Sequence, residues 1–184
     1  GNLAENSGGP HTLKYGVTTN HILGFTMVMP NGNIEKFGSK HRYGTDLDLV
    51  GFITGSEGTL GIATEIIVNL VANPQTTRTF LLTFDSVSHA TDCVSAIIKG
   101  GVIPSALEMI DNLCIQAVEG KLKVGFPIHA AAILLVELDG DASSTQWETK
   151  QLKTITAQFT RHSIEEAKDE VHRQQLWRGR KLAI

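Results

Sequence analysis

Two segments near the start of the chain are dense in glycine, and they constrain the backbone more than any other feature of the sequence. Three glycines fall within residues 1–9 and three more within residues 54–65. Glycine loses more conformational entropy on folding than any other residue, so such density indicates turns with positive φ or backbone amides close to a ligand. The small hydroxyl and amide residues between these glycines suit a phosphate or a polar heterocycle. Two ordinary tight turns are the alternative interpretation.

Neither segment fits the commoner nucleotide-binding patterns. No Gly-x-Gly-x-x-Gly opens a predicted helix, and no Gly-x-x-x-x-Gly-Lys-Ser/Thr occurs in the sequence. The glycines alone therefore suggest a ligand site without identifying the ligand.

Composition indicates a folded globular protein. The 184 residues are 41% hydrophobic and 19% charged, which allows one large or two small domains. A net charge of −3 without a Lys/Arg cluster argues against a nucleic-acid partner. Apolar runs such as residues 130–136 are too short to cross a bilayer, and no secretory signal pattern is present. Cys93 and Cys114 lack metal or redox spacing, so we expect reduced, buried thiols in a cytoplasmic protein.

Residues 1–72 have a β-rich pattern. An apolar run over residues 22–29, a turn signal and a second run over residues 34–37 predict a hairpin. Residues 62–71 are rich in β-branched side chains and predict another strand. A short helix is predicted over residues 46–52, with Asp46 near its N-terminus.

The segment Asn73-Pro74-Gln75 interrupts this pattern and predicts a boundary between domains 1–73 and 74–184. Beyond it the predicted strands cover residues 79–84, 105–110 and 131–138, with a weak strand at 163–167. Predicted helices cover residues 88–99, 113–120, 147–159 and 170–182, and Gly100-Gly101 ends the first of them. This order is typical of a ferredoxin-like α+β sandwich with one antiparallel sheet.

The side chains give no metal or nucleophile pattern. The histidines form no short-spaced pair of the His-x-x-x-His kind, and no Ser-His-Asp or Cys-His grouping can be argued from the sequence. They are His11, His21, His41, His89, His129, His162 and His172. Glu108 and Asp111 adjoin a predicted strand-to-helix junction and could form a catalytic pair. A helix N-cap by Asp111 is the favoured interpretation.

Six strings, in order along the chain, resemble the FAD-linked oxidase family of the vanillyl-alcohol-oxidase type. Within that family the resemblance is greatest to the branch of the glycolate oxidase flavin subunit, with its D-lactate and D-2-hydroxyglutarate dehydrogenase relatives. The strings are NLAENSGG (2–9), DLDL (46–49), GSEGTLGI (55–62), PSALEMIDN (104–112), ILLVELDG (133–140) and LWRGRK (176–181).

This resemblance implies an α+β fold made of two incomplete parts. Residues 1–73 would be the C-terminal half of a PCMH-type FAD-binding domain, and residues 74–184 part of a ferredoxin-like substrate or cap domain. We expect an internal fragment, with the loop that holds the FAD pyrophosphate before Gly1. The family's histidines and acidic residues near the reacting carbon would lie after Ile184, and any metal site would lie outside this chain. Such a fragment is expected to be inactive and to hold FAD weakly.

The resemblance also implies site residues. Both glycine-rich segments would contact FAD, Ile62 through its backbone, with His11 as a weaker candidate. The expected FAD contacts are Ala4, Glu5, Asn6, Ser7, Gly8, Gly9, Glu57, Gly58, Thr59, Leu60, Gly61, Ile62 and Ala63. Arg180 matches the arginine of the family's Leu-Trp-x-x-Arg motif and would bind the substrate carboxylate bidentately. Arg178 falls at a variable position of that motif, and for Arg180 a surface charge is the alternative.

The implied function is FAD-dependent oxidation of a small 2-hydroxy acid, such as glycolate or D-lactate, to the 2-oxo acid. Implied partners are an iron–sulfur subunit and a second flavin-type subunit of a glycolate oxidase complex, or a membrane quinone as electron acceptor. The implied location is the cytoplasm, with peripheral attachment to the inner membrane as a further option. One alternative is a related flavoprotein, namely a D-2-hydroxyglutarate or D-lactate dehydrogenase or one of the alkyl-glycerone-phosphate synthase type. The other is a non-catalytic ferredoxin-like interaction module.

Overall fold

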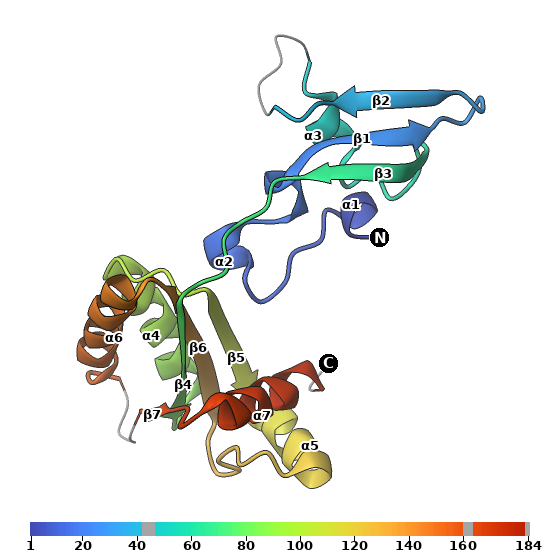
Figure 1. Cartoon of the computed structure of the whole chain (residues 1–184). Coiled ribbons are helices and arrows are strands. Elements are labelled where there is room, and N and C mark those ends of the chain that lie inside the picture. The colour runs from blue at the N-terminus through green and yellow to red at the C-terminus, as the bar shows by residue number, and fades with distance from the viewer. Residues whose placement is uncertain (42–46, 160–163, 183–184) are drawn as a thin grey trace. The chain divides into compact units, whose positions relative to one another are not determined.

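The computed structural model describes residues 1–41, 47–159 and 164–182. The chain divides into two compact units, Gly1–Asn73 and Pro74–Ile184 (Figure 1). The first unit contains α1 (Asn2–Glu5), α2 (Thr12–Tyr15), the 3-10 helix η1 (Thr18–Asn20), β1 (Ile22–Val28), β2 (Ile34–Gly38), α3 (Leu49–Ile53) and β3 (Ile62–Val68). The second contains β4 (Thr76–Phe84), α4 (Val87–Lys99), β5 (Ala106–Asp111), α5 (Asn112–Leu122), β6 (Ala132–Gly140), α6 (Ala142–Thr156), β7 (Glu165–Glu166) and α7 (Glu170–Lys181).

The first unit is built on an antiparallel sheet with strand order β2-β1-β3. The predicted hairpin is confirmed as β1 and β2, whose turn is closed by a hydrogen bond from the Met29 amide to the Asn33 carbonyl (2.8 Å). One apolar cluster joins β1 to the helices of this unit. Its buried members are Leu3, Ile22, Phe25, Met27 and Ile53.

Several boundaries in the first unit differ from prediction. The short helices α1, α2 and η1 were not predicted, because helices of three or four residues have no apolar periodicity and depend on tertiary contacts. β3 ends at Val68 rather than at residue 71. α3 begins at Leu49, and its N-cap Asp48 accepts a hydrogen bond from the Gly51 amide (2.9 Å). The predicted helix start at Asp46 lies outside the described residues.

The second unit confirms the ferredoxin-like prediction. Its sheet has strand order β5-β6-β4-β7, and every neighbouring pair is antiparallel. In chain order β4, β5, β6 and β7 are the first to fourth strands, so the first and third strands lie together in the centre. That is the arrangement of a split βαβ fold. The long central pair runs in register from Thr76 opposite Gly140 to Phe84 opposite Ala132.

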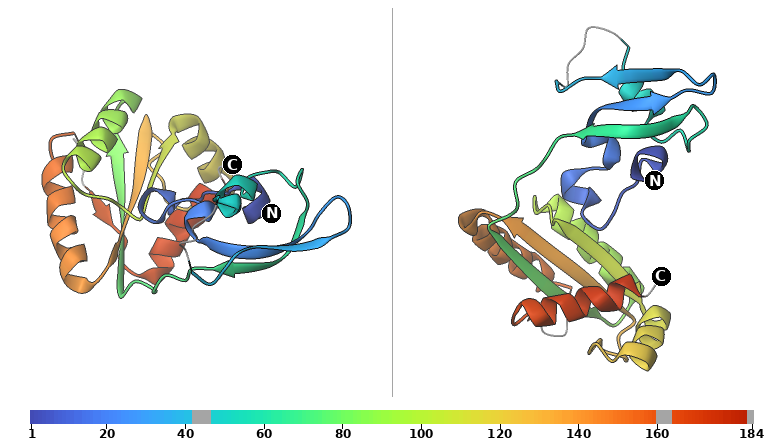
Figure 2. Two further views of the ribbon diagram at one scale, coloured as in Figure 1. Left: turned by 90° about the horizontal axis from the view of Figure 1, so that it is seen from above. Right: turned by 45° about the vertical axis from the view of Figure 1, so that its right-hand side comes forward.

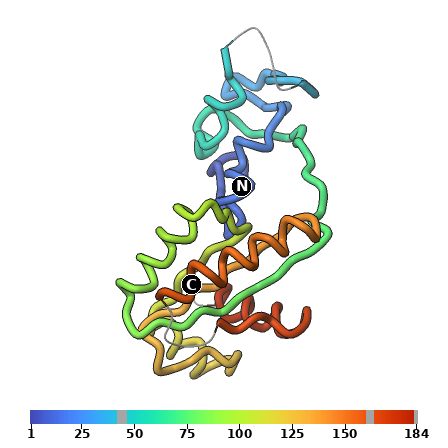
Figure 3. Tube along the Cα trace, turned by 90° about the vertical axis from the view of Figure 1, so that its left-hand side faces the viewer, coloured from blue at the N-terminus to red at the C-terminus, as the bar shows by residue number. Residues whose placement is uncertain are grey.

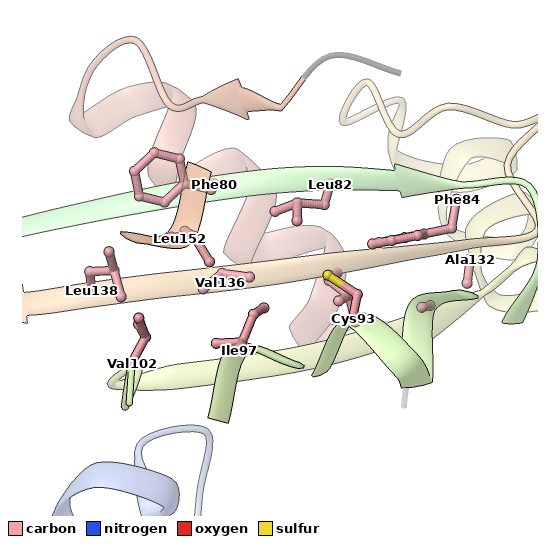
Figure 4. Packing of buried hydrophobic residues seen from close by; sticks show 12 residues of the cluster. Phe80, Leu82, Phe84, Cys93, Ile97, Val102, Ala132, Val136, Leu138 and Leu152 are labelled. Carbon is pink, nitrogen blue, oxygen red and sulfur yellow. The ribbon is translucent and has the colours of Figure 1, made fainter. Parts of the chain in front are cut away.

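Helices cover both faces of this second sheet (Figures 1 and 2). On one face α4 and α6 lie side by side, as the trace in Figure 3 shows. The side chains that alternate toward this face form the larger core, with Cys93 and Ile97 of α4 packed against β4 and β6 (Figure 4). Its buried members are Phe80, Leu82, Phe84, Ala90, Cys93, Ile97, Val102, Ala132, Leu134, Val136, Leu138 and Leu152.

The opposite face of the same sheet is covered by α5 and α7. The intervening residues of the central strands point here, because successive side chains alternate between the faces of a strand. Leu81, Ile133 and Leu135 pack against Ile115 of α5 and Leu176 of α7. This face carries the polar residues described below.

Other differences in the second unit have local causes. α6 begins at Ala142 rather than at residue 147, because Asp141 caps the helix by accepting hydrogen bonds from the amides of Ser143 and Ser144 (both 3.0 Å). β7 is shorter than the strand predicted over residues 163–167, and residue 163 itself lies outside the described residues. Cys93 is buried as expected, whereas Cys114, in the first turn of α5, is only half-buried.

Candidate functional site

The two glycine-rich segments of the first unit lie against each other. The amide of Gly55 donates to the carbonyl of Leu3 (2.9 Å), and the amide of Glu57 donates to the carbonyl of Ala4 (2.8 Å). The buried side chain of Leu3 anchors α1 in the core beneath this contact. Segments that are separated in sequence by about fifty residues therefore form one continuous surface, as a shared ligand site requires.

Positive φ angles explain much of the glycine content of the second segment. Glu57 (φ 54°) and Gly58 (φ 74°) are successive left-handed residues. No atom lies within 4 Å of where a Cβ of Gly58 would stand, so backbone conformation rather than crowding favours glycine there. At Gly61 both reasons apply, because φ is 154° and a Cβ would lie 2.5 Å from the Val28 carbonyl oxygen.

Some polar groups of this surface are already hydrogen-bonded within the protein. The Gly9 amide donates to Thr12 Oγ1 (2.7 Å), and Asn6 Oδ1 accepts from the Thr19 amide (2.9 Å). By contrast, the amides of Gly8 and Gly58 have no hydrogen-bond partner within residues 1–41, 47–159 and 164–182, and both residues are exposed. These two amides can donate to an acceptor-rich ligand such as a phosphate or a flavin ring.

The predicted contact residues fall into three groups. Leu60 and Ala63 are half-buried and pack against the core of the first unit. Ile62 is 71% exposed at the start of β3, and the side chain of Glu57 is exposed in its turn. The other predicted contacts lie on α1, at its C-cap or in the two loops. They are Ala4, Glu5, Asn6, Ser7, Gly8, Gly9, Gly58, Thr59 and Gly61. His11 occupies the N-cap position of α2, just after the first segment.

A polar pair stands on the α5–α7 side of the second unit. Arg180 Nη2 of α7 donates to Glu108 Oε2 of β5 at 3.1 Å, and each side chain is 22% exposed. Arginine carries five N–H donors, and this is the only side-chain hydrogen bond of Arg180 within the described ranges. A guanidinium oriented by one carboxylate can still receive a second one on its remaining donors.

Glu108 and Asp111 have different partners in this arrangement. Asp111 is the N-cap of α5, as predicted, and accepts a hydrogen bond from the Cys114 amide (2.9 Å). That bond and one from the Cys114 side chain hold the pKa of Asp111 below its usual value. Glu108 instead pairs with Arg180.

Sequence reasoning missed Glu137. Its side chain is buried in β6, where it accepts hydrogen bonds from Thr79, Arg173 and Trp177. The available signal was its position as a charged residue after the apolar run of residues 130–136. A carboxylate within a buried strand requires hydrogen-bonded partners.

The described residues contain neither a metal-binding cluster nor a membrane-spanning helix. No group of three or more His, Cys, Asp or Glu side chains there could hold a metal ion. None of the helices described is long and apolar enough to cross a membrane.

Comparison with known proteins supports the resemblance seen in the sequence. Residues 73–184 match the family model "FAD linked oxidases, C-terminal domain". Over the whole chain, identity is 42% to glycolate oxidase subunit GlcD of Escherichia coli and 37% to the GlcD of Bacillus subtilis. It is 29% to the mitochondrial D-lactate dehydrogenase [cytochrome] of Arabidopsis thaliana. The chain spans 37%, 39% and 32% of the lengths of these relatives.

Solved structures show the same fold. Alkyldihydroxyacetonephosphate synthase superposes with a TM-score of 0.69 at 22% identity, covering 86% of this chain and 31% of that protein. p-Cresol methylhydroxylase superposes with a TM-score of 0.66 at 14% identity, covering 84% of this chain and 36% of that protein. At these identities the likeness concerns the fold alone.

Proposed function

We propose that this chain, which belongs to the family of FAD linked oxidases defined by their C-terminal domain, is part of an enzyme that oxidises a small 2-hydroxy acid, such as glycolate or D-lactate, to the 2-oxo acid. The relatives named glycolate oxidase subunit and D-lactate dehydrogenase support this reaction class. We assign residues 1–73 to part of an FAD-binding domain and residues 74–184 to part of a substrate domain.

The observation that carries the proposal is the partial burial of Arg180 and its pairing with Glu108. Its side chain is only 22% exposed and its guanidinium is oriented by Glu108, so it is not a freely solvated surface charge. Because arginine stays protonated and offers a planar fork of donors, it suits the carboxylate that every 2-hydroxy acid carries. In this role Arg180 binds the substrate carboxylate and thereby orients the adjacent α-carbon.

The two glycine-rich segments provide the proposed FAD contacts. Gly8 and Gly58 are exposed, and their amides, which lack a hydrogen-bond partner in the described part of the chain, suit the acceptor atoms of the cofactor; the contact between the segments brings their backbones together. FAD held by these residues would supply the two-electron redox chemistry of the oxidation. The residues of this chain bind and orient, while Glu57 and Ile62 add exposed side chains beside the amides.

Relatives that are named as subunits of glycolate oxidase support a proposal that this protein works with partner subunits. We propose an assembly with an iron–sulfur subunit and a second flavin-type subunit, with a membrane quinone as the alternative acceptor. Its place would be the cytoplasm, at the surface of the inner membrane when a quinone is reduced. Co-purification of the complete polypeptide with partner subunits, analysed by mass spectrometry and iron content, tests this assignment.

The experiment for the carboxylate contact compares two arginines of α7. In the complete flavin-loaded polypeptide that carries this sequence, Arg180→Lys keeps the charge but loses the bidentate geometry. Loss of a charge-assisted hydrogen bond of about 1.5–3 kcal/mol predicts a fall of roughly 10- to 100-fold in kcat/KM for the 2-hydroxy acid.

Arg178→Lys is the matched control, because Arg178 is exposed on the same helix. It should leave kcat/KM within about twofold, as expected of an exposed charge. If Arg180→Lys behaves like this control, the carboxylate contact is wrong.

A further inference from the structure

A buried carboxylate lies under α7 without any part in the binding described above. Glu137 of β6 is 3% exposed. Three donors converge on its Oε2 atom, namely Thr79 Oγ1 at 2.6 Å, Trp177 Nε1 at 2.7 Å and Arg173 Nη1 at 3.2 Å. These donors come from β4 and α7, so one oxygen atom connects the two central strands to the helix.

Burying the Glu137 carboxylate costs free energy that an apolar side chain at the same position would not cost. Burying a carboxylate is unfavourable unless it is paired and hydrogen-bonded, and an apolar side chain would fill the same space more cheaply. Apolar contacts, such as that of buried Leu176, hold α7 against the sheet but have little directional preference. Hydrogen bonds require alignment of donor and acceptor, so the bonds to Glu137 fix the rotation and axial position of α7.

The bonds to Glu137 lie on the same helix face as the proposed substrate ligand. Arg173, Trp177 and Arg180 are spaced by four and then three residues, the spacing of neighbours along one side of an α-helix. In the sheet Glu137 lies opposite Ala106, two residues before Glu108 in the neighbouring strand. Glu137 and Glu108 therefore point to the same face of the sheet and contact consecutive parts of α7.

We propose that Glu137 is a positioning residue for Arg180: by holding Trp177 and Arg173 it sets where α7 places the Arg180 guanidinium beside Glu108. The inference rests on the proposed role of Arg180 as the ligand of the substrate carboxylate. It assigns to Glu137 an effect on binding and turnover that is transmitted through Arg180, separate from any effect on stability.

A double-mutant cycle in the complete flavin-loaded polypeptide tests this. Glu137→Gln keeps the shape of the side chain but removes its charge, and we expect it to lower kcat/KM for the 2-hydroxy acid by roughly tenfold, since small misplacements of a binding group are costly. In the Arg180→Lys background the same substitution should lower kcat/KM by less than about twofold, because residues that act through one another are not additive.

Two further variants keep the test decisive. Thr79→Val removes the donor to Glu137 that comes from a central strand, and it serves if Glu137→Gln does not fold. It should then lower kcat/KM in the parent but have less than about a twofold effect in the Arg180→Lys background. Glu170→Gln is the matched control, because Glu170 also pairs with Arg173 (2.8 Å) but is exposed. It should leave kcat/KM within about twofold.

The outcomes separate the inference from the function on which it rests. An equal loss from Glu137→Gln in both backgrounds would show an independent structural role and overturn the inference. So would wild-type kinetics of Glu137→Gln, or an equal loss from the Glu170→Gln control. Wild-type kinetics of Arg180→Lys alone would instead remove the proposed substrate contact, and this inference with it.

Discussion

Gly179 offers a sharp test of how α7 packs. A Cβ at this position would lie 2.7 Å from both Cε2 and Cζ of the Phe126 ring and 2.9 Å from Cγ2 of Val124. Phe126 is 3% exposed and belongs to the core under α5 and α7, so its ring cannot move into solvent. We therefore expect Gly179→Ala to destabilise the second unit, although alanine is the better helix former.

The magnitude follows from two opposing contributions. Replacing a helical glycine by alanine stabilises a helix by about 0.8–1 kcal/mol. Inserting a methyl group into a packed core costs about 1–3 kcal/mol. Gly120 lies in α5 with no atom within 4 Å of the place where an alanine methyl group would stand, so Gly120→Ala gains the first contribution without the second. The difference between the two variants should therefore be about 1–3 kcal/mol in the free energy of unfolding, with Gly120→Ala the more stable.

Urea denaturation of the two variants and the parent, followed by circular dichroism, measures this difference at constant m-value. The parent should lie between the variants or close to Gly179→Ala. Equal stability of Gly179→Ala and Gly120→Ala would refute the close approach of α7 to Phe126.

Three further predictions follow from the structure. Asp141→Asn should lower the free energy of unfolding at neutral pH and make it vary less as the pH falls. The bonds from Ser143 and Ser144 hold the pKa of Asp141 well below its usual value, so its contribution to stability is present above about pH 4 and is lost as the pH falls. If the stability of the variant falls with pH as steeply as that of the parent, this prediction is wrong. Burial raises the pKa of the Cys93 thiol to about 11, so native-state alkylation followed by mass spectrometry should modify Cys114 first, and equal rates would argue against a buried Cys93. Limited proteolysis should cut the exposed residues 69–75 and leave a resistant core that starts near residue 75, whereas preferential survival of residues 1–72 would contradict an independent second unit.

The elements with regular periodicity could be predicted from the sequence. The hairpin of β1 and β2, and the alternation of strands and helices from β4 to β6, follow from apolar patterns among residues that are close in sequence. The predicted start of α6 is too late because it does not take the capping role of Asp141 into account, although that signal is local. The helices α1, α2 and η1 have no periodic signal to detect.

The contacts that build the candidate site could not be predicted in the same way. The pairing of Arg180 with Glu108 joins residues 72 positions apart, and that of Trp177 with Glu137 joins residues 40 apart. Such contacts depend on sheet order and on which face α7 covers, which no local pattern specifies. The family resemblance pointed to Arg180 and to both glycine-rich segments, but the mutual contact of those segments required the fold.

The central claim, oxidation of a 2-hydroxy acid by FAD bound in part to this chain, is tested most directly by anaerobic titration of the complete flavin-loaded polypeptide. Glycolate and D-lactate are added in turn, and the absorption band of the oxidised flavin is followed, with the corresponding uncharged amides as controls. The account predicts that at least one of the two acids bleaches the band stoichiometrically with formation of its 2-oxo acid, while the amides, which lack the carboxylate for Arg180, bleach it far more slowly. A flavin that stays oxidised with both acids, or that the amides reduce equally fast, would contradict it.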